Sequence, residues 1–542
     1  MKNSIYILLA AAVAALCACS SLETSPEDYY ASGNYWQTTA QVESYLPGIY
    51  NKMRNIAFNH TIRFGELGAG IYVQPISTNG NNVSDQPIII HNLSPDVPGV
   101  ESWGEYYSVI ADCNLFIEKV QEADFVPSDE RNALLAQVYG LRALLYFDLY
   151  RIWGGVPLRL EPDLAAHGES DVKNLYLARS TAKQTMEQIM ADIDLSLNLY
   201  EGLDGINDYG WTKNYWSEEA SKCLAAEIML WNTKVSVGDY AAVSDGSLLP
   251  EAKSLLEEVE SSYGLKLLDN FADVFSATNK CNDEIIFAVN YTQGEATNSN
   301  GSYLYHTSTG EIHNMLGRDG EPFGDPLQLN SGYNQTYQYI PEMYLQYDGT
   351  SRDAELDAPV DTRADATFIN AYIEDEGRVV LNGTMCRKNV GTVSSGTRVM
   401  CGDYIFYRLS WVYLTLAEIA NWQGSASDYE AAMNKVRARA YGSAWNESLA
   451  AEYGSFKENE LAILFEKDKE FVQEGQRWWD LRRMQAVKGN ESSHLLFQSE
   501  ANPVADGTAV LSEEFRALWP VSTKIRANDP LLATSDQQNT GY

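Results

Sequence analysis

The sequence predicts a mostly α-helical protein built from helix hairpins, with a large loop-rich, partly β insertion. Apolar residues recur at helical spacing through the first half of the chain and again through its last third. Between these parts, from about residue 263 to 403, helical spacing gives way to Gly, Asn, Ser, Thr and Tyr. The 542 residues, 45% of them apolar, are enough to bury a large core.

Four helices are predicted in the first half of the chain. The longest follows Ser128, an expected N-cap, and carries two neighbouring apolar stripes, so we expect other helices to cover it on two sides. Ser180 and Ser217 are the expected N-caps of two further helices. Trp103 lies on the same helical stripe as Tyr107, which favours packing of its ring in the core over contact with a ligand.

Residues 408–440 form the clearest repeat unit. A helical stripe ends at Gly424, and Ser427 with Glu430 forms a predicted capping box that opens a second helix. This size and build are typical of a tetratricopeptide-like helix hairpin, and the segment 238–242 lies between two helices in the same way. Stacked hairpins bury a helix on two sides, which agrees with the doubled stripe after Ser128.

The insertion and a shorter irregular stretch, 65–100, are the expected ligand-binding loops. Loop regions of this length inside a folded protein usually have a function. Within the insertion, the apolar run 285–289 is typical of a strand. The insertion is therefore expected to be partly β.

The N-terminus predicts export and lipidation. An apolar run follows Lys2 and is too short to span a bilayer, as expected of a signal peptide over residues 1–18. Cys19 follows Ala18 at its end, in a pattern that resembles the lipobox of bacterial lipoproteins. Lipid on Cys19 is the predicted membrane attachment, and residues 19–40 are the predicted tether. The alternative is an ordinary cleaved signal in which Cys19 has no role.

Charge and cysteine content limit the possible partners. The net charge of −35, from 74 acidic and 39 basic residues, repels nucleic-acid phosphates and disfavours nucleic-acid binding. The spacing of Cys386 and Cys401 leaves open whether they pair. No Cys/His cluster has metal-ligand spacing, so no cofactor is predicted. A solvated turn is favoured over a calcium site for four acidic residues whose spacing departs from the EF-hand: Asp348, Asp353, Glu355 and Asp357.

Three motifs resemble those of one protein family. They are LRALLYFDL at 141–149 leading into WGGVPL at 153–158, EGQRWWDLRR at 474–483, and NDPL at 528–531 with QNTGY at 538–542. Together with the lipobox and the helix hairpins, they resemble, in order along the whole chain, the SusD/RagB family of outer-membrane nutrient-binding lipoproteins. The expected organisation is a helical tetratricopeptide-like scaffold over 41–262, a ligand-binding region over 263–403, and a C-terminal repeat and signature region over 404–542.

The resemblance implies a binding protein rather than an enzyme. Such proteins sit on the cell surface, capture oligosaccharides or polysaccharide, and deliver them to a TonB-dependent SusC-like outer-membrane transporter. Peptide capture, as in RagB-like members, is the alternative within the family. A surface glycoside hydrolase is less favoured, because it needs two carboxylates facing each other across a cleft and the sequence singles out no such pair. A purely structural repeat protein would bind no ligand.

Both irregular stretches contain the side chains that bind sugars. Sugar sites combine flat aromatic rings with amide, carboxylate and guanidinium groups. For any one tyrosine, packing beneath a loop is the alternative to ligand contact. The predicted ligand-binding residues are Tyr72, Asn81, Tyr303, Tyr305, His306 and Tyr333.

The charged segment 465–484, which contains two adjacent tryptophans, is predicted to be scaffold rather than an active site. Helical spacing predicts one buried stripe, which consists of Leu461, Leu464, Phe465, Asp468, Phe471 and Val472. Glu466, Glu470 and Glu474 follow one another on its flank, where they are expected to face water or pair with Lys and Arg. Ion pairs are expected to tie the following turn to adjacent helices through Arg477, Asp480, Arg482 and Arg483.

Overall fold

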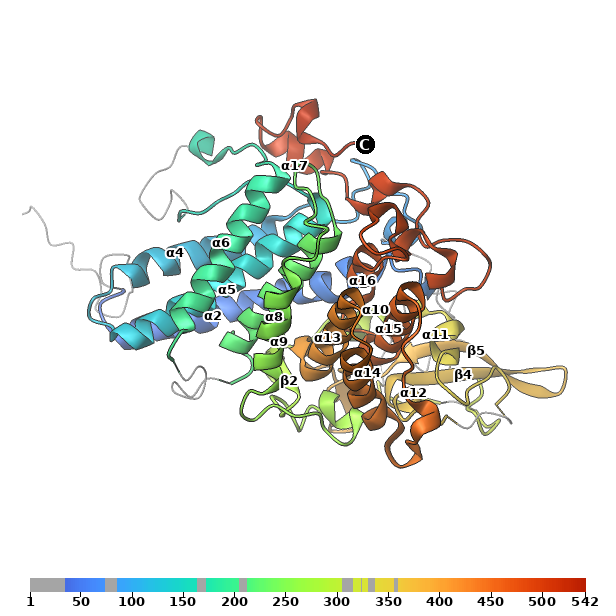
Figure 1. Ribbon diagram of the computed structural model, residues 1–542. Helices are drawn as coiled ribbons and strands as arrows, with labels where there is room; N and C mark the ends of the chain where they lie inside the picture. Colours follow the sequence, from blue (N-terminus) through green and yellow to red (C-terminus); the bar gives the residue numbers. More distant parts are fainter. Residues whose placement is uncertain are drawn as a thin grey trace, which may run out of the picture.

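Helices build most of the scaffold in the computed structural model of the chain (Figure 1). The structure describes residues 35–73, 85–162, 172–203, 212–304, 315–322, 324–329, 337–354 and 359–542. A first group of helices comprises α2 (Thr39–Phe58), α4 (Gly104–Gln121), α5 (Ser128–Trp153), α6 (Ala182–Tyr200), α8 (Glu218–Lys234) and α9 (Leu249–Glu260). A second group comprises α13 (Leu409–Gln423), α14 (Ala426–Tyr441), α15 (Phe456–Phe471) and α16 (Arg477–Arg483). Helix α9 packs against α13 and so joins the two groups.

Consecutive helices pack as the predicted hairpins. Helix α13 packs on α14, α8 on α9, and α5 on both α4 and α6. Helix α5 is accordingly buried on nearly every side from Ala133 to Trp153, which confirms that other helices cover it. Five shorter helices complete the described set: α3 (Gln86–Ile89), α10 (Asn300–Tyr303), α11 (Pro341–Leu345), α12 (Arg363–Thr367) and α17 (Thr523–Asn528).

Three helix starts differ from the predicted ones by one or two residues, and a fourth is as predicted. Gly424 ends α13 in the left-handed conformation, and the chain re-enters a helix at once, so Ser427 lies inside the first turn of α14 and the predicted capping box is absent. Pro127, rather than Ser128, occupies the N-cap of α5. Thr181, one residue after Ser180, caps α6 through a capping box. The predicted N-cap of α8, Ser217, is confirmed.

Small antiparallel sheets form mainly from the part of the chain that lies between the two helix groups in sequence. The predicted strand is present as β2 (Ile285–Val289), which pairs with β8 (Tyr404–Arg408). A four-stranded sheet has the order β1-β3-β5-β4, and β6 pairs with β7. Their bounds are β1 (Tyr72–Val73), β3 (Gln338–Tyr339), β4 (Phe368–Asp375), β5 (Arg378–Cys386), β6 (Thr392–Ser394) and β7 (Thr397–Val399). In the four-stranded sheet, Tyr72 of β1 lies opposite Tyr339 of β3. This pairing brings together two irregular stretches that are distant in sequence.

Helix α15 buries most of its predicted stripe and its charged flank as well. Leu464, Asp468, Phe471 and Val472 are buried as predicted, whereas Leu461 and Phe465 are only partly buried. Glu466 and Glu470 on the flank are also buried, so of the two predicted alternatives they pair with cations and do not face water. The buried carboxylates accept hydrogen bonds from arginines on other elements: Arg363 Nη2 lies 2.6 Å from Glu466 Oε1, and Arg408 Nη1 lies 2.6 Å from Glu470 Oε1. Buried charge is tolerated here because every carboxylate has hydrogen-bonded cations as partners.

The turn between α15 and α16 is tied down mainly as predicted. Arg477 pairs with Asp468, and Asp480 lies 2.7 Å from Lys467 and 2.6 Å from Arg483. Arg482 is the exception, since it donates to the Arg151 carbonyl and lies over the ring of Trp231 instead of pairing with a carboxylate. The segment 465–484 is therefore buried structure.

Cys386 and Cys401 are both buried free thiols. Cys386 ends β5, and Cys401 lies between β7 and β8. Burial raises the pKa of the Cys386 thiol to about 12, so it stays protonated at neutral pH. The pairing that the spacing left open is not present.

Candidate functional site

Two of the predicted ligand-binding residues, Tyr72 and Tyr303, belong to the described part of the chain. Outside it lie Cys19, Asn81, Tyr305, His306 and Tyr333, and also the acidic residues Glu355 and Asp357. Within the described ranges, no three His, Cys, Asp or Glu side chains gather closely enough to hold a metal ion. The site is therefore built from Tyr72, Tyr303 and the side chains that surround them.

A π-helical turn at the end of α2 positions an arginine. The turn, Asn59–Phe64, continues α2 without a break, and such wide turns occur often at functional sites. Arg63 Nε donates to Asp85 Oδ2 over 3.0 Å, and its Nη1 donates to Asn59 Oδ1 over 2.9 Å. The Arg63 side chain is 24% exposed while Asp85 is 4% exposed, so a buried carboxylate fixes a guanidinium that reaches solvent.

Aromatic rings surround this guanidinium and form what we call the aromatic cluster: Phe58, Tyr72, Tyr303, Tyr337 and Tyr339. Tyr303 stacks on Phe58 with 4.6 Å between ring centroids and on Tyr337 with 5.7 Å. The Arg63 Cζ lies 5.9 Å from the centre of the Tyr303 ring. Tyr303 is half-buried, so this ring and the guanidinium reach the surface side by side.

Tyr337 joins the two sides of the cluster. Its hydroxyl donates to Asp85 Oδ2, and its backbone N–H donates to the Tyr303 carbonyl over 2.9 Å. Burial, together with the charge of Asp85, raises the pKa of Tyr337, so its hydroxyl stays protonated and remains a donor. Asp85 thus accepts hydrogen bonds from both Arg63 and Tyr337.

Tyr72 lies in the interior of the cluster. Its ring centroid is 4.6 Å from that of Tyr339, and the hydroxyls of both lie within 2.9 Å of Glu66 Oε2. Glu66 is buried, and burial raises the pKa of its carboxyl group. Tyr72 is 4% exposed in these contacts. A direct role for Tyr72 in ligand binding stays a prediction, as it does for Tyr303.

The cluster also holds the ends of three chain segments whose other residues include the remaining predicted ligand contacts. Val73 pairs with Gln338 between β1 and β3. Asp85 contacts Tyr337, and Tyr337 contacts Tyr303. The described residues that flank two distant stretches of the sequence therefore meet in one place in the fold.

Arg63 and Asp85 were missed by the sequence-based prediction. Arg63 lies at the end of a helical stretch, and nothing in its sequence neighbourhood marks it as a ligand contact. The one available signal was proximity in sequence, since Asp85 lies four residues after Asn81. The pairing of Arg63 with Asp85 depends on tertiary packing.

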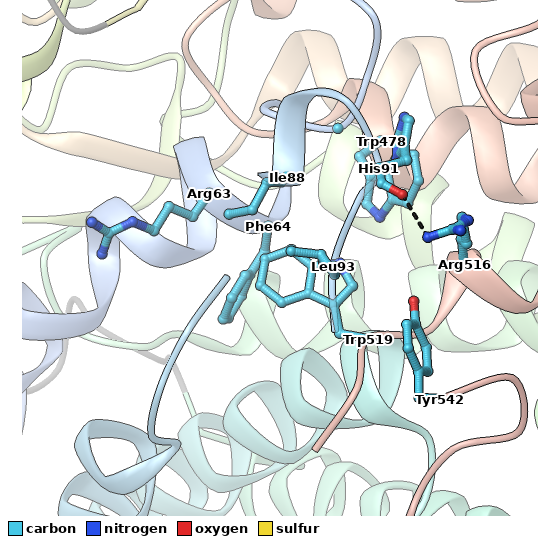
Figure 2. Close-up of a pocket in the computed structure, with 10 residues that line it drawn as sticks. Arg63, Phe64, Ile88, His91, Leu93, Trp478, Arg516, Trp519 and Tyr542 are labelled. Carbon is cyan, nitrogen blue, oxygen red and sulfur yellow. Dashed lines mark hydrogen bonds between the residues drawn. The ribbon is translucent and has the colours of Figure 1, made fainter. Parts of the chain in front are cut away.

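A small cavity adjoins the cluster below Arg63 (Figure 2). Its volume is about 10 Å³, which has room for a water molecule but not for a sugar ring. In Figure 2 the guanidinium of Arg63 points away from the other labelled side chains, and Arg516 donates to the His91 carbonyl over 2.8 Å. Burial and Arg516 lower the pKa of His91 to about 4, so its ring is neutral at pH 7. This cavity is a packing junction beneath the site.

A larger cavity, the α17 cavity, lies beside Trp103 and has a volume of about 340 Å³. Helix α17, the start of α4 and the segments around Pro157 and Tyr176 line it. Trp103 is buried and packs edge-on against Trp153 at a centroid distance of 5.8 Å. The predicted core packing of Trp103 is thus confirmed, although the ring also forms part of a cavity wall.

Comparisons with known proteins identify the family. A profile of the SusD family matches residues 370–542, and one described as "Starch-binding associating with outer membrane" matches residues 23–201. The solved structure of a SusD superfamily protein from Bacteroides fragilis is 45% identical, covers 94% of this chain and 100% of that chain, and has a TM-score of 0.84. The chain belongs to the SusD/RagB family. The motifs at 141–158, 474–483 and 528–542 lie within the residues that these two profiles match.

Other SusD-family proteins resemble smaller parts of this chain or share only its fold. SusD-like protein P38 of Formosa agariphila is 30% identical over 196 residues, which are 36% of this chain and 37% of that relative. The surface glycan-binding protein A of Bacteroides thetaiotaomicron, solved in complex with laminarihexaose, is 19% identical with a TM-score of 0.63. That alignment covers 93% of this chain and 99% of the other. At this identity the likeness shows the SusD fold alone.

Proposed function

We propose that this SusD-family protein binds oligosaccharides or polysaccharide at the bacterial surface and passes them to a SusC-like TonB-dependent transporter without cleaving them. The observation that carries the proposal is the pair of Tyr303 and Arg63, both partly exposed, with Arg63 held by the buried Asp85. An aromatic ring beside a fixed guanidinium offers a sugar an apolar face and hydrogen-bond donors for its hydroxyl groups. The laminarihexaose complex of a protein with this fold supports the same ligand class.

The preformed geometry supports capture rather than catalysis. Asp85, the carboxylate nearest to Arg63, is buried and accepts hydrogen bonds from both Arg63 and Tyr337, so it is not placed to act as an acid or nucleophile toward a sugar. Arg63 Nη2 makes no hydrogen bond to the described residues and is available as a donor. Binding would therefore fix a sugar chain at Arg63 and Tyr303 and leave its glycosidic bonds intact.

The first experiment measures binding and cleavage together. The protein lacking residues 1–19 would be titrated calorimetrically with laminarin, soluble starch, xylan and a mixture of peptides, and screened on a glycan array. We expect affinity for at least one glycan, none for the peptides, and no new reducing ends after prolonged incubation. Release of reducing ends would identify an enzyme, and affinity for peptides alone would favour peptide capture.

Lipid on Cys19 is the proposed attachment to the outer membrane. Within the part of the chain that the structure describes, no helix has the length and apolar composition needed to cross a bilayer. We expect the full-length protein to sediment with membranes and to require detergent for release, and Cys19→Ala to appear in the soluble fraction. Fractionation followed by immunoblotting measures this. A Cys19→Ala protein that still needs detergent would contradict lipid anchoring, and Cys17→Ala, which should stay membrane-bound, is the control.

A further inference from the structure

We propose that the ligand is an extended sugar chain, and that it occupies a second subsite on α2 in addition to the aromatic cluster. This inference rests on the proposed function and concerns a cavity of about 270 Å³, here called the α2 cavity. Helix α2 forms one wall of this cavity, and the segments around Tyr215 and Glu295 form the others. Its size is close to the lower end of the range for ligand pockets.

The α2 cavity is lined by the same kinds of groups as the aromatic cluster. The rings of Tyr50 and Tyr215 meet edge to face with 4.8 Å between their centroids. Arg54 Nη1 lies 2.7 Å from Glu295 Oε1, which places an ion pair at the rim. Asn51, on the exposed face of α2, adds an amide. Aromatic, amide, guanidinium and carboxylate groups are the set that recognises sugars.

Some of these groups fix the walls, and others are available to a ligand. The Tyr50 hydroxyl donates to Gln137 Oε1 and accepts from the backbone N–H of Trp216. Arg54 Nε donates to the Asn290 carbonyl. Within the described residues, the Asn51 amide and Glu295 Oε2 make no hydrogen bond. The cavity thus combines a fixed frame with polar groups that can bind sugar hydroxyls, and its polar groups need no rearrangement to do so.

Two walls of the α2 cavity continue into the aromatic cluster. Along α2, Phe58 follows Arg54 by one turn, or about 6 Å, and Phe58 stacks on Tyr303. The second wall runs along the chain from Asn290 to Tyr303, and the Tyr291 hydroxyl donates to the Arg54 carbonyl over 2.9 Å. Phe58 and Tyr291, which connect the two places, are buried. The α2 cavity and the cluster are therefore two neighbouring sites separated by packed side chains, and a ligand that contacts both must cross the surface between them.

The separation of the two sites selects for long ligands. Arg54 and Arg63 are separated by nine residues of continuous helix, about 13 Å along the axis, which exceeds the reach of one sugar ring. A disaccharide bound at the cluster would leave the α2 cavity empty, whereas a hexasaccharide would contact both. Contacts at two linked subsites multiply their contributions to affinity.

The test compares short and long ligands in variants of the α2 cavity. Asn51→Ala and Tyr215→Ala would be titrated with the disaccharide and the hexasaccharide prepared from whichever glycan binds the wild-type protein. We expect the affinity of Tyr215→Ala for the hexasaccharide to fall about fivefold, or about 1 kcal/mol, with disaccharide affinity unchanged. Asn51→Ala should fall by about twofold to threefold, and it preserves folding because Ala favours an exposed helical position.

Four outcomes would count against the inference. Wild-type hexasaccharide affinity in both variants, or an equal loss for both ligand lengths, would overturn the second subsite while leaving the proposed function intact. Tyr176→Ala, a half-buried tyrosine in the α17 cavity, is the matched control and should bind as wild type; a matching loss there would also overturn the inference. A wild-type protein that binds no glycan would reject the proposed function itself, and this inference with it.

Discussion

Glu470→Ala should lower the free energy of unfolding by about 4 kcal/mol, because it breaks a buried network of ion pairs. The Glu470 side chain is 0% exposed, and three arginines from different elements donate to it. Arg408 Nη1 lies 2.6 Å from Oε1, Arg363 Nη1 lies 2.8 Å from Oε2, and Arg439 also contacts Oε1. Removing the carboxylate leaves these guanidinium groups buried with fewer partners, which costs more than the ion pairs contribute.

The charge of Glu470 is maintained by its partners. Burial alone would raise the pKa of its carboxyl group, but Arg439, Arg408 and Arg363 hold that pKa well below the ordinary value for glutamate. Because the folded-state pKa is depressed, this contribution to stability is present above the unfolded pKa and is lost only as the pH falls toward the depressed value. At neutral pH the full effect should therefore be measurable.

Urea unfolding monitored by tryptophan fluorescence measures the effect. Glu187→Ala is the control, because Glu187 lies on the exposed surface of α6 with its side chain 58% exposed and its ion pair to Lys183 is 3.9 Å long. That control should change the free energy of unfolding by less than about 0.5 kcal/mol. If Glu470→Ala does not fold, Glu470→Gln, which retains the shape and two hydrogen-bonding atoms, should fold with intermediate stability. Equal stability of the Glu470 variants and the control would contradict the role of the buried charges.

The helix hairpins were predictable from sequence because their cores are apolar. Spacing alone located α5, α8 and α13, and the strand at 285–289 followed from an uninterrupted apolar run. For α15, spacing located most of the buried stripe but could not show that the glutamates on its flank are buried too, because spacing treats glutamate as a surface residue. The arginines that allow Glu466 and Glu470 to be buried come from α12, β8 and α14, which no local pattern connects to this helix.

The sequence-based prediction treated the signature segment 474–483 and the ligand-binding loops as independent parts of the protein, but the structure connects them. Gly475 has φ of +76°, and a Cβ at this position would lie 2.6 Å from the Thr61 backbone, so only glycine allows the signature turn to approach the π-helical turn that carries Arg63. The Gly475 N–H then donates to Glu66, the carboxylate on which Tyr72 and Tyr339 converge. The signature segment is structural, and part of what it supports is the aromatic cluster.

Arg63→Met should reduce glycan affinity by at least about tenfold, because hydrogen bonds to a charged group contribute about 1.5–3 kcal/mol each. Methionine retains the apolar stem beside Phe58 and Tyr303 but removes every donor. Asp85 would keep the hydrogen bond from Tyr337, so we expect the free energy of unfolding to fall by only about 2 kcal/mol and the variant to fold. Calorimetric titration with the glycan that binds the wild-type protein, together with a thermal melt, measures both quantities.

Arg131→Met separates a specific role of Arg63 from a general effect of losing an arginine. Arg131 lies on α5, pairs with Asp124 at 3.1 Å, and has a side-chain exposure of 26%, close to the 24% of Arg63. It lies outside the aromatic cluster, so its loss should leave glycan affinity unchanged. Arg63 differs from it in one respect that matters for binding, because the buried Asp85 fixes the Arg63 guanidinium beside the half-buried ring of Tyr303. Wild-type affinity in Arg63→Met would show that the sugar is held elsewhere, and equal losses in both variants would show that the effect is not specific to the cluster.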